Sequence, residues 1–562
     1  MKTKGRISAL LKKKILILDG AMGTELYKRG LPAGGCPEVW CLHHPEAVAA
    51  IHGAYHAAGA AGIYTATFGA NRVKLGRYGV TDVVATNQAL ARIARETVGP
   101  RGIVFGDIGP TGRFVEPFGD LPFTEAVAVF REQAEGLLAG GVDGFVIETM
   151  MDIQEARAAL IAVQEVADLF TIVSMTYEAS GRTLNGTDPL TALVTLQALG
   201  ADAVGCNCSA GPEAMLAMIS QMKPYAIIPL LAKPNAGLPE LVGEETVFTM
   251  DAERFACLGP AFAEAGVNLM GGCCGTTPDH IAALAGRLAA LPPADPVRRT
   301  LTAASSARQA LILERGQPLA LVGGWLNLAE NETLRQVAAA GEVGPLRQAA
   351  REQDRAGAQL LQWKAVASGL TEEEAPDAVL AQLTPTTRLP FLIDSEEGGG
   401  VERLLERYPG RVLLRSKAGE KVSQLLMAAS RYGAVPILAV PPEGGPPYCK
   451  AEIRSVLTEA MRYGFPKGGV VIELTPATVL PAASVLQTLL GLISWCSEKV
   501  GCPTLLGLTA IGRDLPERPW LQAAFLASAQ AAGLTLVIAD PGIAELGGIR
   551  AAGNLLHRRA TA

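Results

Sequence analysis

Long apolar runs are missing from this 562-residue chain. No uninterrupted apolar stretch reaches the 18 or more residues that a membrane-spanning helix requires. The N-terminal segment MKTKGRISALLKKKILILDG places basic residues before ILIL, but this short apolar run ends in Asp19-Gly20 and no small-residue cleavage site follows. We therefore expect a cytoplasmic protein with no membrane partner.

Positive charge and aromatic side chains are also scarce. Lys and Arg number 49 against 55 Asp and Glu, which gives a net charge of −6, and the longest basic run is Lys12-Lys13-Lys14. Aromatic residues make up 5% of the chain. Without a basic patch or aromatic stacking platforms, a nucleic-acid partner is not indicated.

Cysteine is too sparse for a disulfide-stabilised scaffold, with ten residues in 562. In a reducing compartment, clustered cysteines more often bind metal or take part in chemistry. What the chain does have is apolar material: 49% of residues are hydrophobic and 19% are charged. This balance indicates a globular protein, and the length suits two large domains.

Short β-branched or Leu-rich runs alternate with longer Ala-rich stretches throughout, which is typical of βα units around a parallel sheet. Each half has eight such runs, so we predict an α/β protein of two tandem (βα)8 TIM-type barrels. The barrels are expected at residues 1–290 and 311–562, joined by a Pro-led linker at 291–310. The predicted strands are 15–19, 62–67, 102–107, 144–149, 170–176, 202–207, 226–232 and 267–272, then 319–325, 359–364, 390–395, 411–416, 435–440, 469–475, 503–509 and 535–540.

The carboxyl ends of the strands form the active-site face of such a barrel, and in the first half they carry polar residues. Cys208 follows the sixth predicted strand, and Cys273-Cys274 follows the eighth within GGCCG. Flanking glycines allow two consecutive thiols to face one ion. Three thiolates leave the fourth tetrahedral position of a zinc ion open, which is typical of a catalytic site. A substrate thiol would fit this position, since a cation lowers its pKa and zinc does not oxidise it.

Other polar residues near these strand ends have more than one interpretation. Strand alternation gives Cys206 the same facing as Cys208, so Cys206 is either a fourth ligand or a core residue, and we favour the core. Asp107 is expected to hold its loop by accepting backbone hydrogen bonds. The histidines of residues 43–56 are expected to be solvated or packed on the surface of a helix.

Several segments of the first half resemble the homocysteine S-methyltransferase family, most closely the homocysteine half of cobalamin-dependent methionine synthase. They are DGAMGTEL (19–26), TATFGAN (65–71), FGDIGPTG (105–112), DGFVIET (143–149), NGTDP (185–189), CNCSAGP (206–212), KPNAG (233–237) and GGCCGTTP (271–278). One departure is Ala66, where the family usually has Asn.

The resemblance implies that Cys208, Cys273 and Cys274 bind zinc and that zinc binds the sulfur of homocysteine. It also implies which residues border the amino-acid end of the substrate: Asp19, Gly20, Met22, Gly23 and Glu148. This is chemically reasonable, because a carboxylate pairs with an ammonium group and a Gly-rich turn offers backbone N–H groups to a carboxylate.

The second half more faintly resembles the pterin-binding barrel that follows the homocysteine barrel in methionine synthase. The similar segments are VGGWLN (322–327), LIDS (392–395), LLRSKAGE (413–420) and LGLTAIGRDLPER (506–518). Most polar residues of the family are replaced: Gly324-Trp325 stands for Glu-Arg, and Arg415 stands for Asn. Asn327 and Asp394 remain as residual pterin-site residues. A pterin ring left with unpaired donors binds poorly, so we expect the folate site to be lost or remodelled.

These observations predict a zinc-dependent enzyme that methylates homocysteine to methionine. No segment resembles a corrinoid-binding domain, so we expect the methyl donor to be a methylated corrinoid protein supplied in trans, and folate is doubtful as a cofactor. Two alternatives stay open. The chain is a complete methyltetrahydrofolate-homocysteine methyltransferase module with a remodelled folate site, or residues 311–562 are a noncatalytic docking scaffold.

Overall fold

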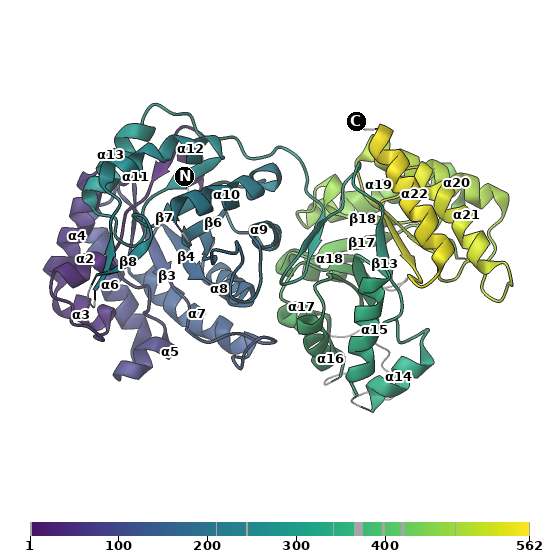
Figure 1. The fold of residues 1–562 in the computed structure, drawn as a ribbon, viewed down its shortest axis with the longest axis horizontal. Helices are drawn as coiled ribbons and strands as arrows, with labels where there is room; N and C mark the ends of the chain where they lie inside the picture. Colours follow the sequence, from purple (N-terminus) through teal and green to yellow (C-terminus); the bar gives the residue numbers. More distant parts are fainter. Residues whose placement is uncertain are drawn as a thin grey trace. The chain divides into compact units, whose positions relative to one another are not determined.

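The computed structural model divides the chain into two compact units, Met1–Arg298 and Arg299–Ala562 (Figure 1). Each unit is described by itself. The residues that the structure describes are 3–209, 211–242, 245–340, 342–364, 375–395, 400–416, 422–477 and 479–560.

The first unit is a barrel of eight parallel strands. Its sheet order is β1-β10-β7-β6-β5-β4-β3-β2, and a parallel bridge between Leu18 and Gly62 joins the first and last strands. Nearly every strand residue is buried, as expected for a parallel sheet covered by helices. The strands are β1 (Leu16–Ile17), β2 (Gly62–Tyr64), β3 (Ile103–Ile108), β4 (Gly144–Met150), β5 (Phe170–Met175), β6 (Ala203–Cys208), β7 (Leu230–Pro234) and β10 (Val267–Met270).

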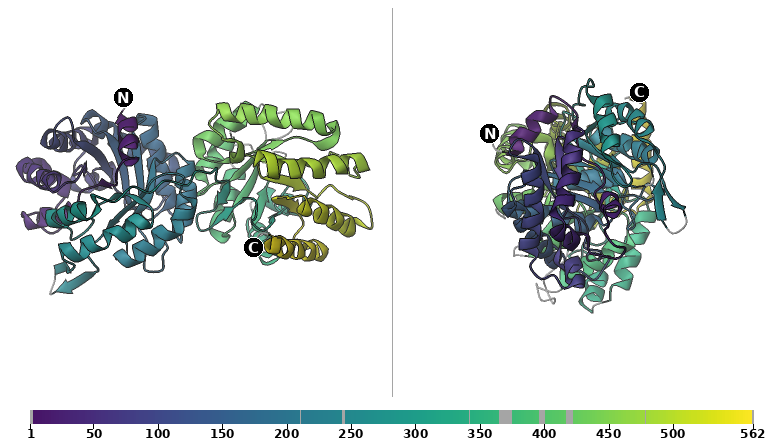
Figure 2. Two further views of the ribbon diagram at one scale, coloured as in Figure 1. Left: turned by 90° about the horizontal axis from the view of Figure 1, so that it is seen from above. Right: turned by 90° about the vertical axis from the view of Figure 1, so that its left-hand side faces the viewer.

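Helices surround this barrel (Figures 1 and 2). Several begin at an Asp whose carboxylate accepts a backbone N–H of the first turn, as Asp82 does for α6 and Asp152 for α8. The helices are α1 (Thr3–Leu11), α2 (Gly23–Lys28), α3 (Pro37–His43), α4 (Pro45–Ala57), α5 (Arg72–Leu75), α6 (Val83–Val98), α7 (Phe123–Ala139), α8 (Ile153–Val166), α9 (Pro189–Ala198), α10 (Pro212–Met222), α11 (Ala252–Cys257), α12 (Gly259–Glu264) and α13 (Pro278–Leu288), with short turns η1 (Gly76–Tyr78) and η2 (Lys223–Tyr225).

Helix α1 contributes to the core of the first barrel. Ile7 and Leu11 pack with the inward-facing side chains Leu16, Phe105 and Leu231 in one buried cluster. The basic, amphipathic start of the chain is therefore part of the fold, and its apolar residues contact the inside of the barrel.

The second unit is a closed barrel of strands in chain order, β13 to β20. Its strands are β13 (Ala320–Gly323), β14 (Leu360–Trp363), β15 (Phe391–Ser395), β16 (Leu413–Ser416), β17 (Val435–Ala439), β18 (Val471–Glu473), β19 (Thr504–Gly507) and β20 (Leu536–Ala539). Its helices are α14 (Glu332–Ala339), α15 (Gly344–Arg355), α16 (Ala375–Leu383), α17 (Gly400–Arg407), α18 (Val422–Tyr432), α19 (Pro446–Arg462), α20 (Ala483–Trp495), α21 (Arg518–Ala531) and α22 (Ala544–Ala560), with short turns η3 (Thr384–Thr386), η4 (Pro442–Gly444), η5 (Lys467–Gly469) and η6 (Cys496–Val500).

The prediction of two tandem barrels is confirmed, and each of the sixteen expected runs overlaps a barrel strand. Two antiparallel hairpins were not expected. The first is β8 (Pro239–Val242) with β9 (Glu245–Phe248), which follows β7. The second is β11 (Ala303–Ser305) with β12 (Ala310–Ile312), inside and just beyond the segment expected to be a linker. Ala304 of this hairpin packs into the core of the second barrel, so the hairpin is part of that unit.

Strand β7 differs from its prediction, because it begins four residues later than expected and extends past Lys233 to Pro234. This shift places the Lys233 side chain in the barrel. In the described parts of the chain, no helix has both the length and the apolar character needed to cross a membrane.

Candidate metal and substrate site

The structure brings together the three cysteines that the sequence singled out. The Sγ atoms of Cys208, Cys273 and Cys274 all lie within 4.8 Å of one another, at the carboxyl ends of β6 and β10. Cys208 Sγ is 3.0 Å from Cys273 Sγ and 3.9 Å from Cys274 Sγ. All three cysteines are free thiols.

The geometry and chemistry of this cluster fit a zinc ion. Tetrahedral Zn–S bonds of about 2.3 Å place the sulfur atoms about 3.8 Å apart. The distance between Cys208 Sγ and Cys274 Sγ, 3.9 Å, agrees with this spacing, whereas Cys208 Sγ and Cys273 Sγ lie closer together, at 3.0 Å. Hydrogen bonds from the Cys208 and Cys273 thiols lower the pKa of Cys274 to about 3, while hydrogen bonds to its two neighbours raise the pKa of Cys208. The thiols thus share protons among themselves, and a divalent cation would replace those protons as the positive charge between three thiolates.

The backbone at Cys208 is unusual. Cys208 and Ser209 have φ of 55° and 64°, in the left-handed region that few residues other than glycine adopt. This turn re-aims the Cys208 side chain, so strand alternation no longer relates it to Cys206. Cys206 is fully buried in β6 and is outside the cluster of three thiols found in the described residues, so the fourth-ligand interpretation is wrong.

The pair Cys273-Cys274 is held by the strand next to it. The Cys273 N–H donates to the Pro234 carbonyl at 2.8 Å, and the Cys274 N–H donates to Asn235 Oδ1 at 3.0 Å. Gly275 follows with φ of 79°, a left-handed conformation that turns the chain away toward α13. Pro234 at the end of β7 and Asn235 directly after it thus fix the backbone of both cysteines.

A cavity of about 310 Å³ adjoins the cluster. All of the residues predicted to hold metal or substrate line it. These are Asp19, Gly20, Met22, Gly23, Glu148, Cys208, Cys273 and Cys274. Much of the remaining lining is apolar, including Leu26 and Phe68.

Asp19 has a buried partner that the sequence did not identify. Lys233 Nζ lies 2.9 Å from Asp19 Oδ1 and 3.5 Å from the centre of the Tyr64 ring, while Asp19 Oδ2 accepts the Tyr64 N–H at 2.7 Å. Burial alone lowers the pKa of Lys233, but attraction to Asp19 and Glu148 outweighs it and raises the pKa, so the ammonium stays charged. Asp19 is therefore engaged in positioning the strand ends.

Glu148 and Asp107 are buried carboxyl groups beside the same cavity. Burial raises the pKa of Glu148 to about 8 and raises that of Asp107 well above its usual range. Asp107 Oδ1 is buried without a hydrogen-bond partner among the described residues. The loop is held instead by main-chain groups of Asp107, whose N–H donates to Thr65 Oγ1 at 2.8 Å and whose carbonyl accepts from Thr67 Oγ1 at 2.7 Å. The expectation that this carboxylate holds the loop by accepting backbone hydrogen bonds is therefore wrong, since no described N–H group donates to Oδ1.

The strand ends of the second barrel form an ion network. Arg415 donates through Nη2 to Asp394 Oδ2 at 2.8 Å and through Nη1 to Glu473 Oε1 at 2.9 Å, and Gln362 Nε2 donates to Asp394 Oδ2 at 2.6 Å. Asp394, a predicted residual pterin-site residue, thus already has its hydrogen bonds. Asn327, the other such residue, accepts the N–H of Ala329 in its own turn. Residues 417–420 of the LLRSKAGE segment lie outside the described residues.

Comparison with known proteins supports the assignment of the first barrel. Residues 16–288 match the family model described as homocysteine S-methyltransferase. The resemblance noted in the sequence is confirmed for this part of the chain.

Curated relatives extend the likeness to both barrels. The chain is 27% identical over 573 residues to methionine synthase of Mycobacterium leprae (strain TN), covering 94% of this chain and 47% of that protein. It is also 27% identical over 569 residues to methionine synthase of Mycobacterium tuberculosis (strain ATCC 25618 / H37Rv), and this match covers 94% of this chain and 48% of that protein. The chain therefore spans about half the length of these relatives. Among solved structures, the metallated homocysteine methyltransferase MmuM from Escherichia coli is 26% identical, with a TM-score of 0.43, and covers 50% of this chain and 98% of that one.

Proposed function

We propose that the first barrel transfers a methyl group to the thiolate of homocysteine and releases methionine, with zinc held by Cys208, Cys273 and Cys274. One observation carries this proposal: three thiols from two strand ends converge on a largely apolar cavity that also contains buried carboxyl groups. The family match of residues 16–288 supports the same substrate.

The residues around the cavity suit the two ends of homocysteine. When bound, zinc lowers the pKa of a coordinated thiol, so that the substrate sulfur is a thiolate nucleophile at neutral pH. Glu148 pairs with the substrate ammonium, and an ammonium beside it favours the ionised carboxylate that burial disfavours. The backbone of Gly20–Gly23 lines the cavity and takes the substrate carboxylate.

The methyl donor in this proposal is a methylated corrinoid protein supplied in trans, outside the two barrels. The second barrel is proposed not to bind methyltetrahydrofolate, because Arg415 of β16 pairs with both Asp394 of β15 and Glu473 of β18. A pterin would have to break a charged network that is already satisfied. This favours a noncatalytic role for residues 311–562 over a complete folate-dependent module.

Methionine formation tests the proposal directly. The zinc-loaded full chain should form methionine from homocysteine with at least one donor from a panel of a methylcorrinoid, a sulfonium compound and a betaine, and we expect the methylcorrinoid to serve. A Cys274→Ala variant should be inactive with every donor, whereas the exposed-cysteine variant Cys257→Ala should keep wild-type activity. Failure of the wild-type protein with all donors would refute the methyl transfer.

Isothermal titration with methyltetrahydrofolate separates the two interpretations of the second barrel. We expect no binding at micromolar concentrations. A micromolar dissociation constant would support the complete folate-dependent module instead.

A further inference from the structure

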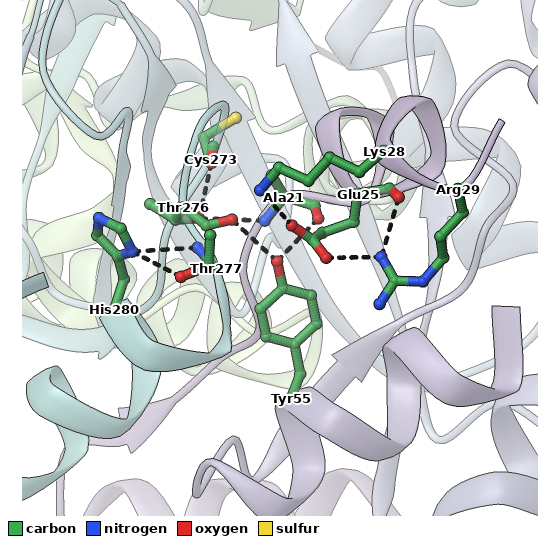
Figure 3. Close-up of polar contacts among 9 residues, drawn as sticks. All are labelled: Ala21, Glu25, Lys28, Arg29, Tyr55, Cys273, Thr276, Thr277 and His280. Atoms are coloured by element: carbon green, nitrogen blue, oxygen red, sulfur yellow. Dashed lines mark hydrogen bonds and ion pairs between the residues drawn. The ribbon is translucent and has the colours of Figure 1, made fainter. Parts of the chain in front are cut away.

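A buried hydroxyl group links the turn that carries the metal cysteines to the turn that borders the amino-acid end of the cavity. Thr276 Oγ1 donates to the carbonyl of Cys273 at 2.7 Å and accepts the N–H of Ala21 at 3.1 Å (Figure 3). The Thr276 side chain is fully buried and is not part of the cavity lining. Thr276 therefore does not line the cavity itself, but it connects the backbone of Cys273 with the backbone of Ala21.

Tyr55 of α4 completes this link. Its hydroxyl group lies 2.8 Å from the Ala21 carbonyl and 3.0 Å from the Thr276 carbonyl, and its single proton is shared between the two oxygens (Figure 3). Tyr55 is 1% exposed, and burial raises its pKa, so the hydroxyl keeps its proton and remains a donor. We refer to Ala21, Tyr55, Thr276 and the Cys273 carbonyl as the Thr276 clamp.

The clamp explains two glycines in the motifs. A Cβ at Gly20 would lie 2.7 Å from Thr276 Oγ1 and 2.7 Å from Tyr55 Cε1, distances that real Cβ atoms do not show. A Cβ at Gly272 would collide with the Thr276 side chain. The two turns also bond directly, since the Gly272 N–H donates to the Asp19 carbonyl at 3.1 Å. Close approach of the two turns is therefore built into the sequence.

We infer that the Thr276 clamp is a positioning device that selects homocysteine over shorter thiol amino acids. This inference rests on the proposed function. The Thr276 clamp fixes the distance between Cys273 and the Gly20–Gly23 backbone. In the proposed function, Cys273 holds the metal that binds the substrate sulfur, and the Gly20–Gly23 backbone binds the substrate carboxylate. Cysteine is shorter than homocysteine by one carbon–carbon bond, about 1.5 Å. If the two turns could move together by about 1.5 Å, the site would bind both cysteine and homocysteine. If the clamp holds the two turns at a fixed distance, only homocysteine is long enough to reach both the metal and the carboxylate site.

Two adjacent threonines supply a matched test. Thr276→Val removes the clamp hydroxyl at nearly constant shape, and Thr276→Ser restores it. Thr277→Val is the control, because Thr277 caps the start of α13 by bonding His280 and has no hydrogen bond to Ala21 among the described residues (Figure 3). Tyr55→Phe removes only the hydroxyl group that bonds the carbonyls of Ala21 and Thr276, and it leaves the hydrogen bonds of Thr276 Oγ1 in place.

The measurements are zinc content and isothermal titration of the zinc-loaded proteins with L-homocysteine and L-cysteine. We expect Thr276→Val to keep its zinc and to lose about tenfold of the wild-type preference for homocysteine, the size expected for one lost buried hydrogen bond. Thr276→Ser should recover the preference, Tyr55→Phe should show a smaller loss, and Thr277→Val should show none.

Several outcomes would overturn the inference. These are an unchanged preference in Thr276→Val, equal losses in Thr276→Val and Thr277→Val, or loss of zinc together with homocysteine binding. If Thr276→Val does not fold, Tyr55→Phe decides, and an unchanged preference in that variant overturns the inference. A wild-type protein that does not bind homocysteine refutes the proposed function itself, which is a different result from a selective wild-type protein whose clamp variants are equally selective.

Discussion

Two hydrogen bonds join the side-chain amide of Asn207 to Thr149 at the carboxyl ends of β6 and β4 in the first barrel. Asn207 Oδ1 accepts the Thr149 N–H at 2.9 Å, and Asn207 Nδ2 donates to Thr149 Oγ1 at 2.7 Å. Thr149 has φ of 62°, which is rare for a β-branched residue. Thr149 directly follows Glu148 in the chain, and Asn207 directly precedes Cys208. The Asn207 amide therefore holds the backbone beside both the carboxyl group proposed for the substrate and one of the thiols proposed for the metal.

Replacement of Asn207 by Leu should therefore weaken both functions of the site. Asn207 is fully buried, and its Nδ2 also lies 3.9 Å from Cys273 Sγ. We expect zinc affinity, measured by competition with a chelator, to fall roughly 10- to 100-fold, as is usual when a group that supports a metal ligand is removed. Ser174→Ala is the control. This substitution removes the hydrogen bond that Ser174 Oγ donates to Asn207 Oδ1 at 2.7 Å, but it keeps both hydrogen bonds between Asn207 and Thr149. Equal zinc affinity in Asn207→Leu and wild type would contradict this role.

Metal analysis addresses the cysteine cluster itself. Cys273→Ala should purify without bound zinc, because only two thiolates remain of the three protein ligands that a catalytic zinc site requires. Cys257→Ala, which changes an exposed cysteine outside the cluster, should retain about one equivalent, as for a single catalytic zinc site. Retention of one equivalent by Cys273→Ala would refute the assignment.

A substrate analogue can isolate the part played by Glu148. We expect Glu148→Gln to bind homocysteine roughly 10- to 100-fold more weakly than wild type, because an ion pair with the ammonium is replaced by a neutral contact. The analogue 4-mercaptobutanoate has no ammonium, so the variant and the wild-type protein should bind it equally in isothermal titration. Glu135→Gln on the exposed side of α7 serves as the control. Equal weakening of both ligands would show that Glu148 does not recognise the ammonium group.

The sequence could predict the barrels and the thiol cluster because both depend on local patterns. Apolar runs at regular intervals specify the strands, and a barrel brings all strand ends to one face. The facing of Cys206 could not be predicted from alternation, because alternation assumes extended backbone and Cys208 is left-handed. The shift of β7 was missed for a related reason: the run 226–232 is apolar, but hydrogen bonds with β6 and β10 decide which part of it pairs.

Contacts between distant segments were beyond reach of the sequence. Tyr55 and Thr276 are separated by 221 positions, and neither belongs to a recognisable chemical pattern. A partial signal existed in the glycines, since Gly20 and Gly272 lie where the clamp leaves no room for a Cβ. The Arg415 network had a similar signal: the replacement of an expected Asn by Arg beside Asp394 was visible, but its partner Glu473 became identifiable only when β16, β17 and β18 were placed side by side.

The Arg415 network should be essential for the stability of the second barrel. The Arg415 side chain is 20% exposed, while those of Asp394 and Glu473 are 7% and 9% exposed. Arg415→Met leaves two buried carboxylates without a cation, so we expect the free energy of unfolding to fall by about 3–5 kcal/mol in urea titrations. Arg335→Met breaks an exposed pair with Glu332 and should change it by less than about 1 kcal/mol. A similar small change in both variants would show that the network contributes little.

His52 should make the first barrel sensitive to mild acid. It is fully buried on α4, neither ring nitrogen has a hydrogen-bond partner among the described residues, and burial lowers its pKa to about 4 from 6.5. Above pH 6.5 the ring is neutral in both the folded and unfolded states, so it adds no pH dependence. Between pH 6.5 and 4 the unfolded chain binds a proton that the folded chain does not, and the free energy of unfolding falls by up to about 3 kcal/mol.

His52→Leu removes this proton uptake while keeping the side chain apolar and similar in size. We expect the variant to gain stability over wild type progressively as the pH falls from 6.5 to 4, measured by urea unfolding at several pH values. His56→Leu is the matched control one turn further along α4, where the ring is exposed and bonded to the Ala60 carbonyl. Its stability curve should run parallel to that of wild type. If the His52→Leu curve were also parallel, a proton on His52 would not be what destabilises the folded barrel in acid.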